Sequence, residues 1–287
     1  MAKKRRRKVS LFANNYTRLV ILFLFLYIVN GHFYIKYYEN LEYIFKYVPI
    51  PALNCYSVPS TIWACPIGSI QHFFVIGSVS FLMFGFLLLL GSLIGRWSCG
   101  WICPFGFIQE WVYHIPSKKI KIPDWLKYGK YLFLIFTVIL MPMFLTTSSG
   151  NTETYFCKIC PSGCIGAGIP QVILHEDLRP LVGFMYWTKL AILSAVLIAA
   201  VFIKRPFCRI VCPLGAFFGI TNKFSLLKLN FNETKCYHCN LCETHCPVDL
   251  NPSKEINSPE CILCGNCTKE RCGAITKIFT IEKERKK

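Results

Sequence analysis

Four long apolar stretches dominate the pattern of hydrophobic and polar positions along this chain of 287 residues. Each carries few or no charged side chains and approaches or exceeds the length, about 20 residues, that an α-helix needs to cross a bilayer. We therefore expect four transmembrane helices, over Leu19–Ile35, Phe73–Gly95, Tyr131–Ser149 and Leu181–Ile203. The last stretch contains Lys189, close enough to its end for the ammonium group to reach the interface.

The first apolar stretch follows a basic run, an arrangement that also begins secretory signal peptides. No small-residue cleavage site follows Val29, where bulky aromatic residues continue the chain. We therefore predict a retained helix rather than a cleaved signal.

Composition agrees with a membrane protein. Hydrophobic residues make up 54% of the chain and charged residues 16%, which is too few charges for a soluble domain of this length. The formal net charge is +17, and the basic residues gather in Lys3–Lys8, Arg96–Lys130 and Lys204–Arg209. We predict a location in the cytoplasmic (inner) membrane of a bacterium or archaeon. Because basic loops stay in the cytoplasm, we also predict that both termini lie on the cytoplasmic side. This accounts for the charge without a nucleic-acid partner.

Eight cysteines near the C-terminus fall into two short runs. Two residues separate the first three cysteines of each run, and a fourth follows after three residues in the first run and four in the second. This is the ligand spacing of a bacterial ferredoxin with two [4Fe–4S] clusters, in which the fourth cysteine of each run binds the other cluster. We expect cluster 1 on Cys236, Cys239, Cys242 and Cys272, and cluster 2 on Cys261, Cys264, Cys267 and Cys246.

A zinc ribbon is the alternative for this region, but it needs two pairs of cysteines and no fourth cysteine in each run. Pro247 follows the fourth cysteine of the first run, as in bacterial ferredoxins, whereas Gly273 takes the place of this proline in the second run. His238 and His245 lie between cluster ligands, and we expect them to be loop residues. The tail therefore carries single electrons.

The other nine cysteines concentrate in the loops that leave the predicted helices. Each loop contains the box Cys-Pro-x-Gly, which begins at Cys65, Cys103, Cys160 and Cys212. The two cytoplasmic copies share a longer pattern, Arg-x2-Cys-x3-Cys-Pro-x-Gly, which begins at Arg96 and Arg205. We interpret this as a tandem duplication of a two-helix unit whose copies cross the membrane in the same sense.

The two cytoplasmic boxes are candidate ligands of a further cluster. Cysteines four residues apart lie on one face of a helical turn, and the proline after the second fits the start of a new helix. One turn from each half would bring four thiolates, the number that one cluster needs, to the inner membrane face: Cys99, Cys103, Cys208 and Cys212. Buried structural cysteines are the alternative. We expect the flanking Trp97, Trp101, Phe105 and Trp111 to be interface anchors.

The outer loops contain five more cysteines: Cys55, Cys65, Cys157, Cys160 and Cys164. The predicted topology places them toward an oxidising compartment. A cluster, thiol–disulfide chemistry and a structural disulfide, for example between Cys55 and Cys65, are equally open for these residues.

Four apolar stretches, twin inner boxes and a double-cluster tail together resemble the NapH-type membrane ferredoxins, the quinol-dehydrogenase subunits of periplasmic nitrate reductase systems. The same core occurs in nitrous-oxide reductase regulators and in polyferredoxin-like proteins. The resemblance covers about residues 19–275. It implies electron exchange with the membrane quinone pool and passage to a partner redox protein. The cysteine-rich stretch Cys157–Ile169 departs from a nitrate-reductase subunit and favours a sister subfamily.

The expected fold is an α-helical membrane protein in which four transmembrane helices form a tandem two-helix repeat, followed by a small α+β ferredoxin-like domain with two [4Fe–4S] clusters. We expect a basic cytoplasmic N-terminus over residues 1–18 and a membrane domain over residues 19–228. The ferredoxin-like domain would follow over residues 229–280 and a basic tail over residues 281–287.

A quinone site needs a hydrogen-bonding or proton-accepting side chain beside an apolar slot. The candidates by position are His32 in a predicted helix, then Gln109, Glu110 and His114 inside, and Gln71, His72, His175 and Glu176 outside. The sequence shows neither GxGxxG after a strand nor a Walker A motif, so we do not expect the chain to use NAD or ATP alone.

We therefore predict a membrane-bound electron-transfer subunit of a quinol-linked oxidoreductase. Its partners would be the lipid bilayer, the quinone pool and other redox subunits, and it would bind no nucleic acid. Two alternatives are electron transfer across the membrane to the outer cysteines, and a maturation or regulatory factor that supplies electrons to a metalloenzyme.

Overall fold

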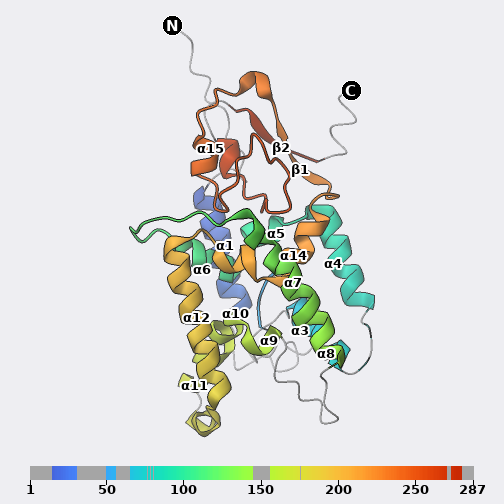
Figure 1. Ribbon diagram of the computed structural model, residues 1–287, viewed down its shortest axis with the longest axis vertical. Helices are drawn as coiled ribbons and strands as arrows, with labels where there is room; N and C mark the ends of the chain where they lie inside the picture. Colours follow the sequence, from blue (N-terminus) through green and yellow to red (C-terminus); the bar gives the residue numbers. More distant parts are fainter. Residues whose placement is uncertain are drawn as a thin grey trace.

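The computed structural model describes residues 15–30, 50–55, 65–75, 77, 79, 81–144, 156–174, 176–269 and 273–279. These residues are mainly helical, with one two-stranded sheet near the C-terminus. Figure 1 shows the sheet and its loops as a cap at one end of an elongated helical bundle.

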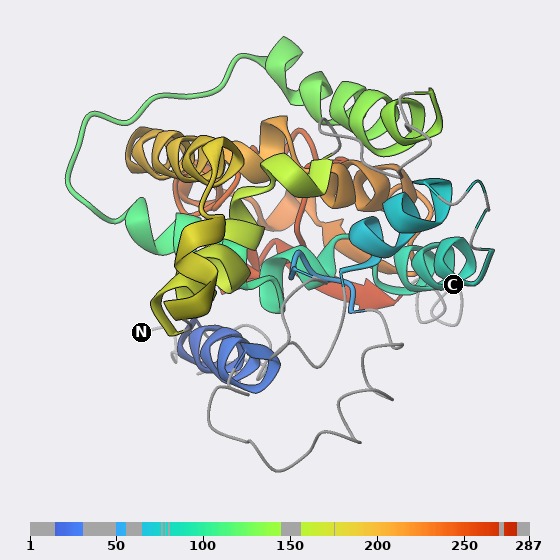
Figure 2. The same ribbon diagram turned by 90° about the horizontal axis from the view of Figure 1, so that it is seen from below.

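Apolar helices form the sides of the bundle and lie at its periphery when the molecule is seen from below (Figure 2). They are α1 (Asn15–Asn30), α4 (Phe81–Ile94), α12 (Phe184–Phe202) and a continuous helix made of η3 (Asp124–Tyr128), α7 (Gly129–Phe133), the π-helical η4 (Leu134–Leu140) and α8 (Met141–Phe144). Large apolar side chains on all four are exposed: Phe23, Leu82, Leu132 and Trp187. Exposed apolar surface on this scale is typical of a lipid-facing bundle.

Two helices are long and apolar enough to cross a membrane, and they correspond to the third and fourth predicted spans. They cover Asp124–Phe144 and Phe184–Phe202, with mean hydropathy of 1.4 and 1.8. Within the described residues α1 has 16 residues and α4 has 14, which is less than the length expected of a straight crossing. Four crossings therefore stay a prediction.

The prediction of a single helix over Phe73–Gly95 is wrong. Its first residues belong to a separate helix, α3 (Pro66–Val75), and α4 begins at Phe81. Gly77, between the two, has a φ of +76°, a left-handed conformation that ends a helix and that glycine adopts without strain. Both helices are apolar, so the hydrophobic pattern runs on through the break and conceals it.

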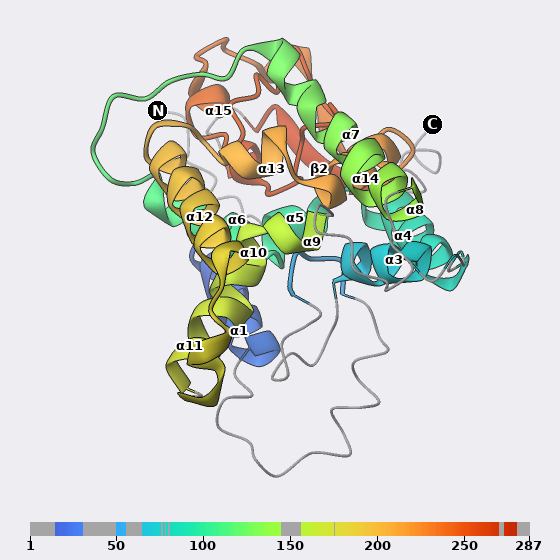
Figure 3. The same cartoon turned by 60° about the horizontal axis from the view of Figure 1, so that its bottom comes forward.

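Short helices fill the centre of the bundle and carry the cysteine boxes (Figure 3). After α10 (Pro161–Gly163), the π-helical η5 (Cys164–Gly168), α11 (Ile169–Leu174) and η6 (Glu176–Leu181) lead to α12, and α11 lies at the end of the molecule away from the cap (Figure 1). The central short helices are α5 (Trp97–Trp101), α6 (Pro104–Val112), α9 (Phe156–Ile159), α10, α13 (Pro206–Ile210) and α14 (Pro213–Thr221). Their aromatic side chains build the core: the ring centroids of Phe105 and Phe207 lie 5.1 Å apart, and those of Phe156 and Phe207 lie 6.3 Å apart.

The expectation that the aromatic residues beside the inner boxes anchor the interface is wrong for two of them. Trp101 and Phe105 are only 0% and 2% exposed, and Trp101 stacks on Trp97 with ring centroids 5.7 Å apart. Trp111 is exposed and fits the expectation. The spacing of aromatic residues along the chain does not separate these cases, because burial depends on what packs against each turn.

The C-terminal cap is a small α+β unit of the ferredoxin-like kind. Strands β1 (Leu227–Phe231) and β2 (Ile275–Phe279) pair in antiparallel fashion, with Leu227 opposite Phe279. Between them lie η7 (Glu233–Lys235), α15 (Leu241–Thr244) and η8 (Asn266–Lys269). Leu229 and Ile275 are buried in a core with Leu263, so the sheet packs on the second cysteine run.

The cap sits directly on helix α5. A Cβ atom on Gly100 would lie 2.5 Å from the backbone oxygen of Ile262, in the second cysteine loop of the cap. Only glycine allows this approach, because the obstacle is backbone and cannot rotate away.

We predict that Gly100→Ala destabilises the full chain by about 1–3 kcal/mol through overpacking against the cap. Gly85→Ala is the matched control, because a Cβ atom on Gly85 in α4 meets no atom within 4 Å. Thermal unfolding of the purified chain should show a lower midpoint for Gly100→Ala alone. Equal midpoints for both variants would contradict the close contact.

Candidate metal centres

Each cysteine box forms the start of a helix in the same way. Cys212 is the N-cap of α14, with φ −62° and ψ 113°, Pro213 occupies the first helical position, and the backbone N–H of Gly215 donates to Cys212 Sγ at 3.3 Å. Proline suits the first helical position because the N–H that it lacks would have no partner there. The box therefore points a sulfur atom at the positive end of a short helix, which favours a thiolate.

The other boxes repeat this geometry. Cys103 has φ −69° and ψ 111° before α6, and Cys160 has φ −68° and ψ 118° before α10. Cys65 likewise stands directly before Pro66, the first residue of α3. The spacing Cys-Pro-x-Gly thus places a cysteine before the first turn of a helix, and at Cys212 the glycine N–H donates to its sulfur.

In each half of the inner site, an arginine donates a hydrogen bond to the backbone of the other half. Arg96, before the first inner box, reaches the carbonyl oxygen of Cys208 at 3.4 Å. Arg205, before the second, donates from Nη1 to the carbonyl oxygen of Cys99 at 2.8 Å. The sequence repeat is therefore also a structural repeat in which each arginine crosses to the opposite half.

Cys103, Cys208 and Cys212 are buried and Cys99 packs against the same core, while their binding of one cluster stays a prediction. Burial together with repulsion from Cys208 and Cys99 raises the pKa of Cys103 to about 12, and the same causes raise the pKa of Cys212. Gln109, which is fully buried, donates to Cys208 Sγ at 3.3 Å and accepts from the backbone N–H of Phe207 at 3.1 Å. Gln109 therefore positions this site and does not line a cavity.

The surroundings of these cysteines fit an anionic cluster. Nε of Arg96, Nε of Arg205 and Oγ of Ser98 are buried polar atoms without a hydrogen-bond partner among the described residues. Buried donors seldom stay unpaired, and the sulfide and thiolate acceptors of a cluster would satisfy them. Two buried guanidinium groups would also offset the negative charge of a cluster with four thiolate ligands.

The two cysteine loops of the cap share an unusual backbone conformation. Positive φ angles occur two and four residues after the first cysteine of each run, at His238 (49°) and Asn240 (56°), and at Leu263 (49°) and Gly265 (83°). Non-glycine residues in this region are strained, and such strain concentrates at functional sites. Alternating right- and left-handed residues turn successive N–H groups inward, forming the anion-binding nest typical of iron–sulfur sites.

Each candidate ligand set of the cap lines its own small cavity. One cavity is bordered by all four expected ligands of cluster 2, including Cys246 from the other run. The second is bordered by Cys236, Cys239 and Cys242. Cys272, the expected fourth ligand of cluster 1, lies outside the described residues. Within the part of the chain that is described, no three potential ligands converge as they would on a single metal ion.

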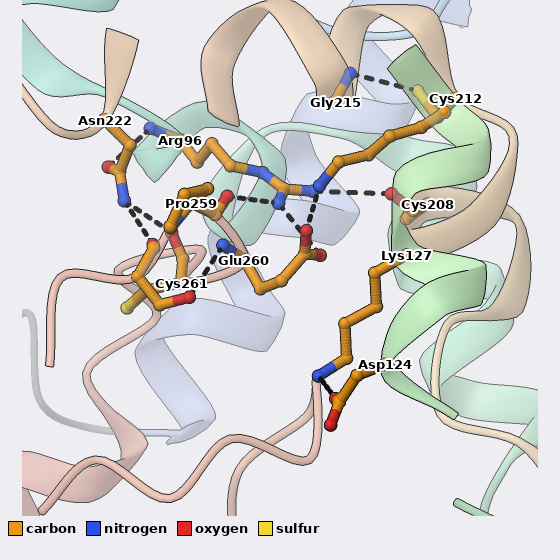
Figure 4. A network of polar contacts seen from close by, with 12 residues as sticks. Arg96, Asp124, Lys127, Cys208, Cys212, Gly215, Asn222, Pro259, Glu260 and Cys261 are labelled. Atoms are coloured by element: carbon orange, nitrogen blue, oxygen red, sulfur yellow. Dashed lines mark hydrogen bonds and ion pairs between the residues drawn. The ribbon is translucent and has the colours of Figure 1, made fainter. Parts of the chain in front are cut away.

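The cap's second set and the inner set are neighbours. Cys99 packs into the same apolar cluster as Cys246 and Cys264. Glu260, next to Cys261, accepts from Arg96 at 3.3 Å and pairs with Lys130 (Figure 4). The ion pair therefore ties the arginine of the inner site to the cap.

Four basic residues that carried the prediction of topology are buried in such pairs. Arg96, Lys130, Arg205 and Arg209 are 1% exposed or less, and Arg209 pairs with Asp249 at 3.3 Å. Their charge serves the interface between the inner site and the cap. The predicted orientation of the chain stays a prediction.

A cavity of about 560 Å³ opens where α1, α6 and the cap meet. Its wall contains the candidates Glu110 and His114, together with Leu19 and the cluster 2 candidate Cys246. A cavity of this size lies in the usual range for sites of small organic molecules. Of the other quinone candidates, Gln71 is buried, His72 and Glu176 are exposed, and His32 and His175 lie outside the described residues.

Glu110 is the centre of a buried ion-pair group. Its carboxylate accepts from Arg18 at 2.6 Å and from Arg205 at 2.5 Å. Burial alone would raise the pKa of Glu110, but Arg205 and Arg18 outweigh it and lower the pKa to about 2. Glu110 is thus a fixed charge at neutral pH, whereas His114 at the cavity wall is exposed.

Three segments of the chain, residues 63–79, 76–123 and 187–232, match a sequence family described as a 4Fe–4S binding domain. The chain is also 32% identical over 210 residues to the uncharacterized protein MJ0750 of Methanocaldococcus jannaschii, covering 71% of this chain and 81% of that protein. The chain belongs to this 4Fe–4S ferredoxin-type electron-transfer family. The second and third matched segments each contain one inner box, so the family relation rests on the duplicated module.

Two further relatives of the family carry functional names. Identity to the proposed electron transport protein YccM of Escherichia coli is 24% over 209 residues, 68% of this chain and 54% of YccM. Identity to the regulatory protein NosR of Stutzerimonas stutzeri is 29% over 182 residues, 59% of this chain and 22% of NosR. The chain thus spans about half of YccM and under a quarter of NosR. No solved structure matches it significantly.

The resemblance to membrane ferredoxins drawn from the cysteine motifs is confirmed at the level of this family. Sequence reasoning missed the role of the arginines. The available signal was their position, since Arg96 and Arg205 each stand three residues before the first cysteine of an inner box. The partner of Arg18 could not be found this way, because Glu110 is 92 residues away.

We predict that Glu110→Gln destabilises the full chain by about 3–5 kcal/mol, because it leaves two buried guanidinium groups without their shared anion. Glu176→Gln is the matched control; its ion pair with Arg179 is exposed on both sides and should be worth less than about 1 kcal/mol. Denaturant unfolding of each variant measures the difference.

The same carboxyl group predicts a pH dependence. Its pKa is about 2 in the folded chain and near 4.5 when unperturbed, so its stabilisation is fully present above about pH 4.5 and is lost as the pH falls toward 2. Glu110→Gln should lack this acid-sensitive part of the stability. An unchanged acid profile in the variant would contradict the assignment.

Proposed function

We propose that this chain is a membrane-bound iron–sulfur protein that exchanges electrons between the quinone pool and a partner redox protein. The cavity between α1, α6 and the cap carries the proposal, because it joins an apolar helix, a proton-accepting side chain and a candidate cluster ligand in one wall. The exposed apolar side chains of the long helices support placement in a membrane.

The four inner cysteines and the eight cap cysteines would hold the clusters. A [4Fe–4S] cluster bound by them would take up or release one electron at a time. The protein supplies the thiolates at helix N-caps, the inward N–H groups of the cap loops and the buried arginines that offset the charge.

His114 is the group that would handle a proton in the cavity. Its Nδ1 lies 2.8 Å from the backbone oxygen of Glu110. A carbonyl oxygen only accepts, so Nδ1 is the donor and carries the proton, which leaves the lone pair on Nε2. Oxidation of a quinol releases two protons and two electrons; Nε2 would accept one proton and the water at the open mouth of the cavity would accept the other.

Glu110 and Arg205 would hold this wall in place. The guanidinium of Arg205 connects Glu110 in the cavity to the carbonyl of Cys99 in the inner site. Cys246 in the same wall belongs to the second set of the cap. A bound quinone head group would therefore lie beside both candidate electron acceptors.

We predict that His114→Ala slows electron transfer from a quinol analogue by roughly 100-fold, the lower end of the usual contribution of a general base. The rate of cluster reduction after mixing, followed by absorbance and checked by EPR, measures it. His72→Ala is the matched control, since His72 is an exposed histidine outside the cavity wall. A full rate in His114→Ala, or an equal loss in both variants, would exclude this site.

A further inference from the structure

The outer cysteines divide into a group of four and one that stands apart. Gln71 lies on α3, the helix that follows Cys65, and accepts a hydrogen bond from the backbone N–H of Cys157, which brings Cys157 to the box of Cys65. Sγ of Cys55 also lies 3.4 Å from the Cβ position of Gly163, in the box of Cys160. Three separate segments of the chain thus bring four thiols to one place.

Cys164, the fifth outer cysteine, stands apart from this group of four. Its side chain is fully buried, beside the part of η5 that packs on Tyr186 of α12. Its Sγ lies 3.8 Å from the Cβ position of Gly168, one turn further along the π-helical η5. The odd fifth cysteine of the outer loops is therefore separate from the other four.

Gln71 forms hydrogen bonds beside this group of four cysteines, as Gln109 does beside the inner cysteines. Gln71 and Gln109 each follow the box cysteine by six residues. Oε1 of Gln71 accepts from the backbone N–H of Cys157 at 3.2 Å, and its Nε2 donates to the carbonyl oxygen of Thr137 at 2.8 Å. Thr137 lies in the π-helical η4, where a carbonyl oxygen normally accepts from the N–H five residues later. That residue is Pro142, which has no N–H, so the carbonyl oxygen of Thr137 is available to Gln71.

The outer group is not on the opposite side of the molecule from the inner group, as the predicted topology implied. The backbone of Leu53 lies next to the sulfur of Cys103, and the backbone of Asn54 lies next to the sulfur of Cys65. Phe156 and Phe207, which directly precede Cys157 and Cys208, have ring centroids 6.3 Å apart. One peptide unit separates the two groups.

The surroundings of the outer group match those of the inner group. Asn54 is 4% exposed, and its Nδ2 has no hydrogen-bond partner among the described residues. Buried donors seldom stay unpaired, so this amide group points to an acceptor other than the described residues, such as the sulfide or thiolate of a cluster. Ser162 Oγ donates to the carbonyl oxygen of Leu53 at 3.1 Å, which fixes the loop of Asn54 and Cys55 against the box of Cys160.

Thiol–disulfide chemistry and a structural disulfide fit these four cysteines less well than a cluster does. Reactive dithiols need an accessible thiol, whereas Cys65 and Cys160 are buried. A disulfide between Cys55 and Cys65 would leave Cys157 and the buried Cys160 without a role. All four are free thiols in the structure.

We propose that Cys55, Cys65, Cys157 and Cys160 bind a further iron–sulfur cluster of the [4Fe–4S] class, next to the inner site and on its side away from the cap, and that Cys164 is not a ligand. The inference extends the proposed function, since it lengthens the series of metal sites from the cap into the core. It does not depend on the quinone cavity.

Iron and acid-labile sulfide in the anaerobically purified full chain test the proposal. At four irons for each site, four occupied sites give about 16 iron atoms per chain. The double variant Cys65→Ala/Cys160→Ala should lose about four of these while the EPR signals of the cap clusters persist. Cys164→Ala is the matched control, because it removes a buried cysteine of the same loops and should lose none.

An unchanged iron content in the double variant, or an equal loss in Cys164→Ala, would overturn the proposal. If the double variant loses all its iron because it fails to fold, the wild-type content decides: about 16 supports the further site, and about 12 or fewer excludes it. Quinol oxidation is measured separately, so a wild-type chain that fails to oxidise quinol yet holds about 16 irons would refute the proposed function alone.

Discussion

Arg96 and Arg205 each leave their own half of the duplicated module and bind the backbone of the opposite half. A buried guanidinium group is tolerated only when it is paired, and each arginine has one acidic partner, Glu260 in the cap and Glu110 on α6. These contacts set how the halves meet, where the cap docks and how the wall of the cavity is held. The candidate metal sites depend on them because thiolates in a low-dielectric core need nearby positive charge.

The same solution for holding sulfur in an apolar core occurs four times. A cysteine precedes a short helix and a proline starts the helix, and at Cys212 the glycine N–H three residues later also donates to the sulfur. These turns carry no stabilising side-chain cap other than the cysteine, so the helices remain short and fill the centre of the bundle. The long apolar helices surround them and leave their outer faces exposed.

The candidate sites form a series without gaps. The two cysteine sets of the cap share a core through Cys242, Cys261 and Cys267, and Cys99 of the inner site packs on the second set. The outer group follows after one peptide unit. Electron carriers must lie close together to exchange electrons, and this compact arrangement suits the electron-transfer family to which the chain belongs.

The sequence by itself determined the membrane-protein composition, the ferredoxin-like ligand spacing, the duplication and the start of a helix at each box. All of these rest on residues a few positions apart, where spacing fixes geometry. Only the tertiary structure decided that Phe73–Gly95 is broken into two helices, that Gln109 is buried at Cys208, and that Cys55 joins a group that leaves out Cys164. These outcomes depend on contacts between distant segments, such as that between Gln109 and Cys208, which are 99 residues apart. Packing selects such contacts, and the local pattern does not encode them.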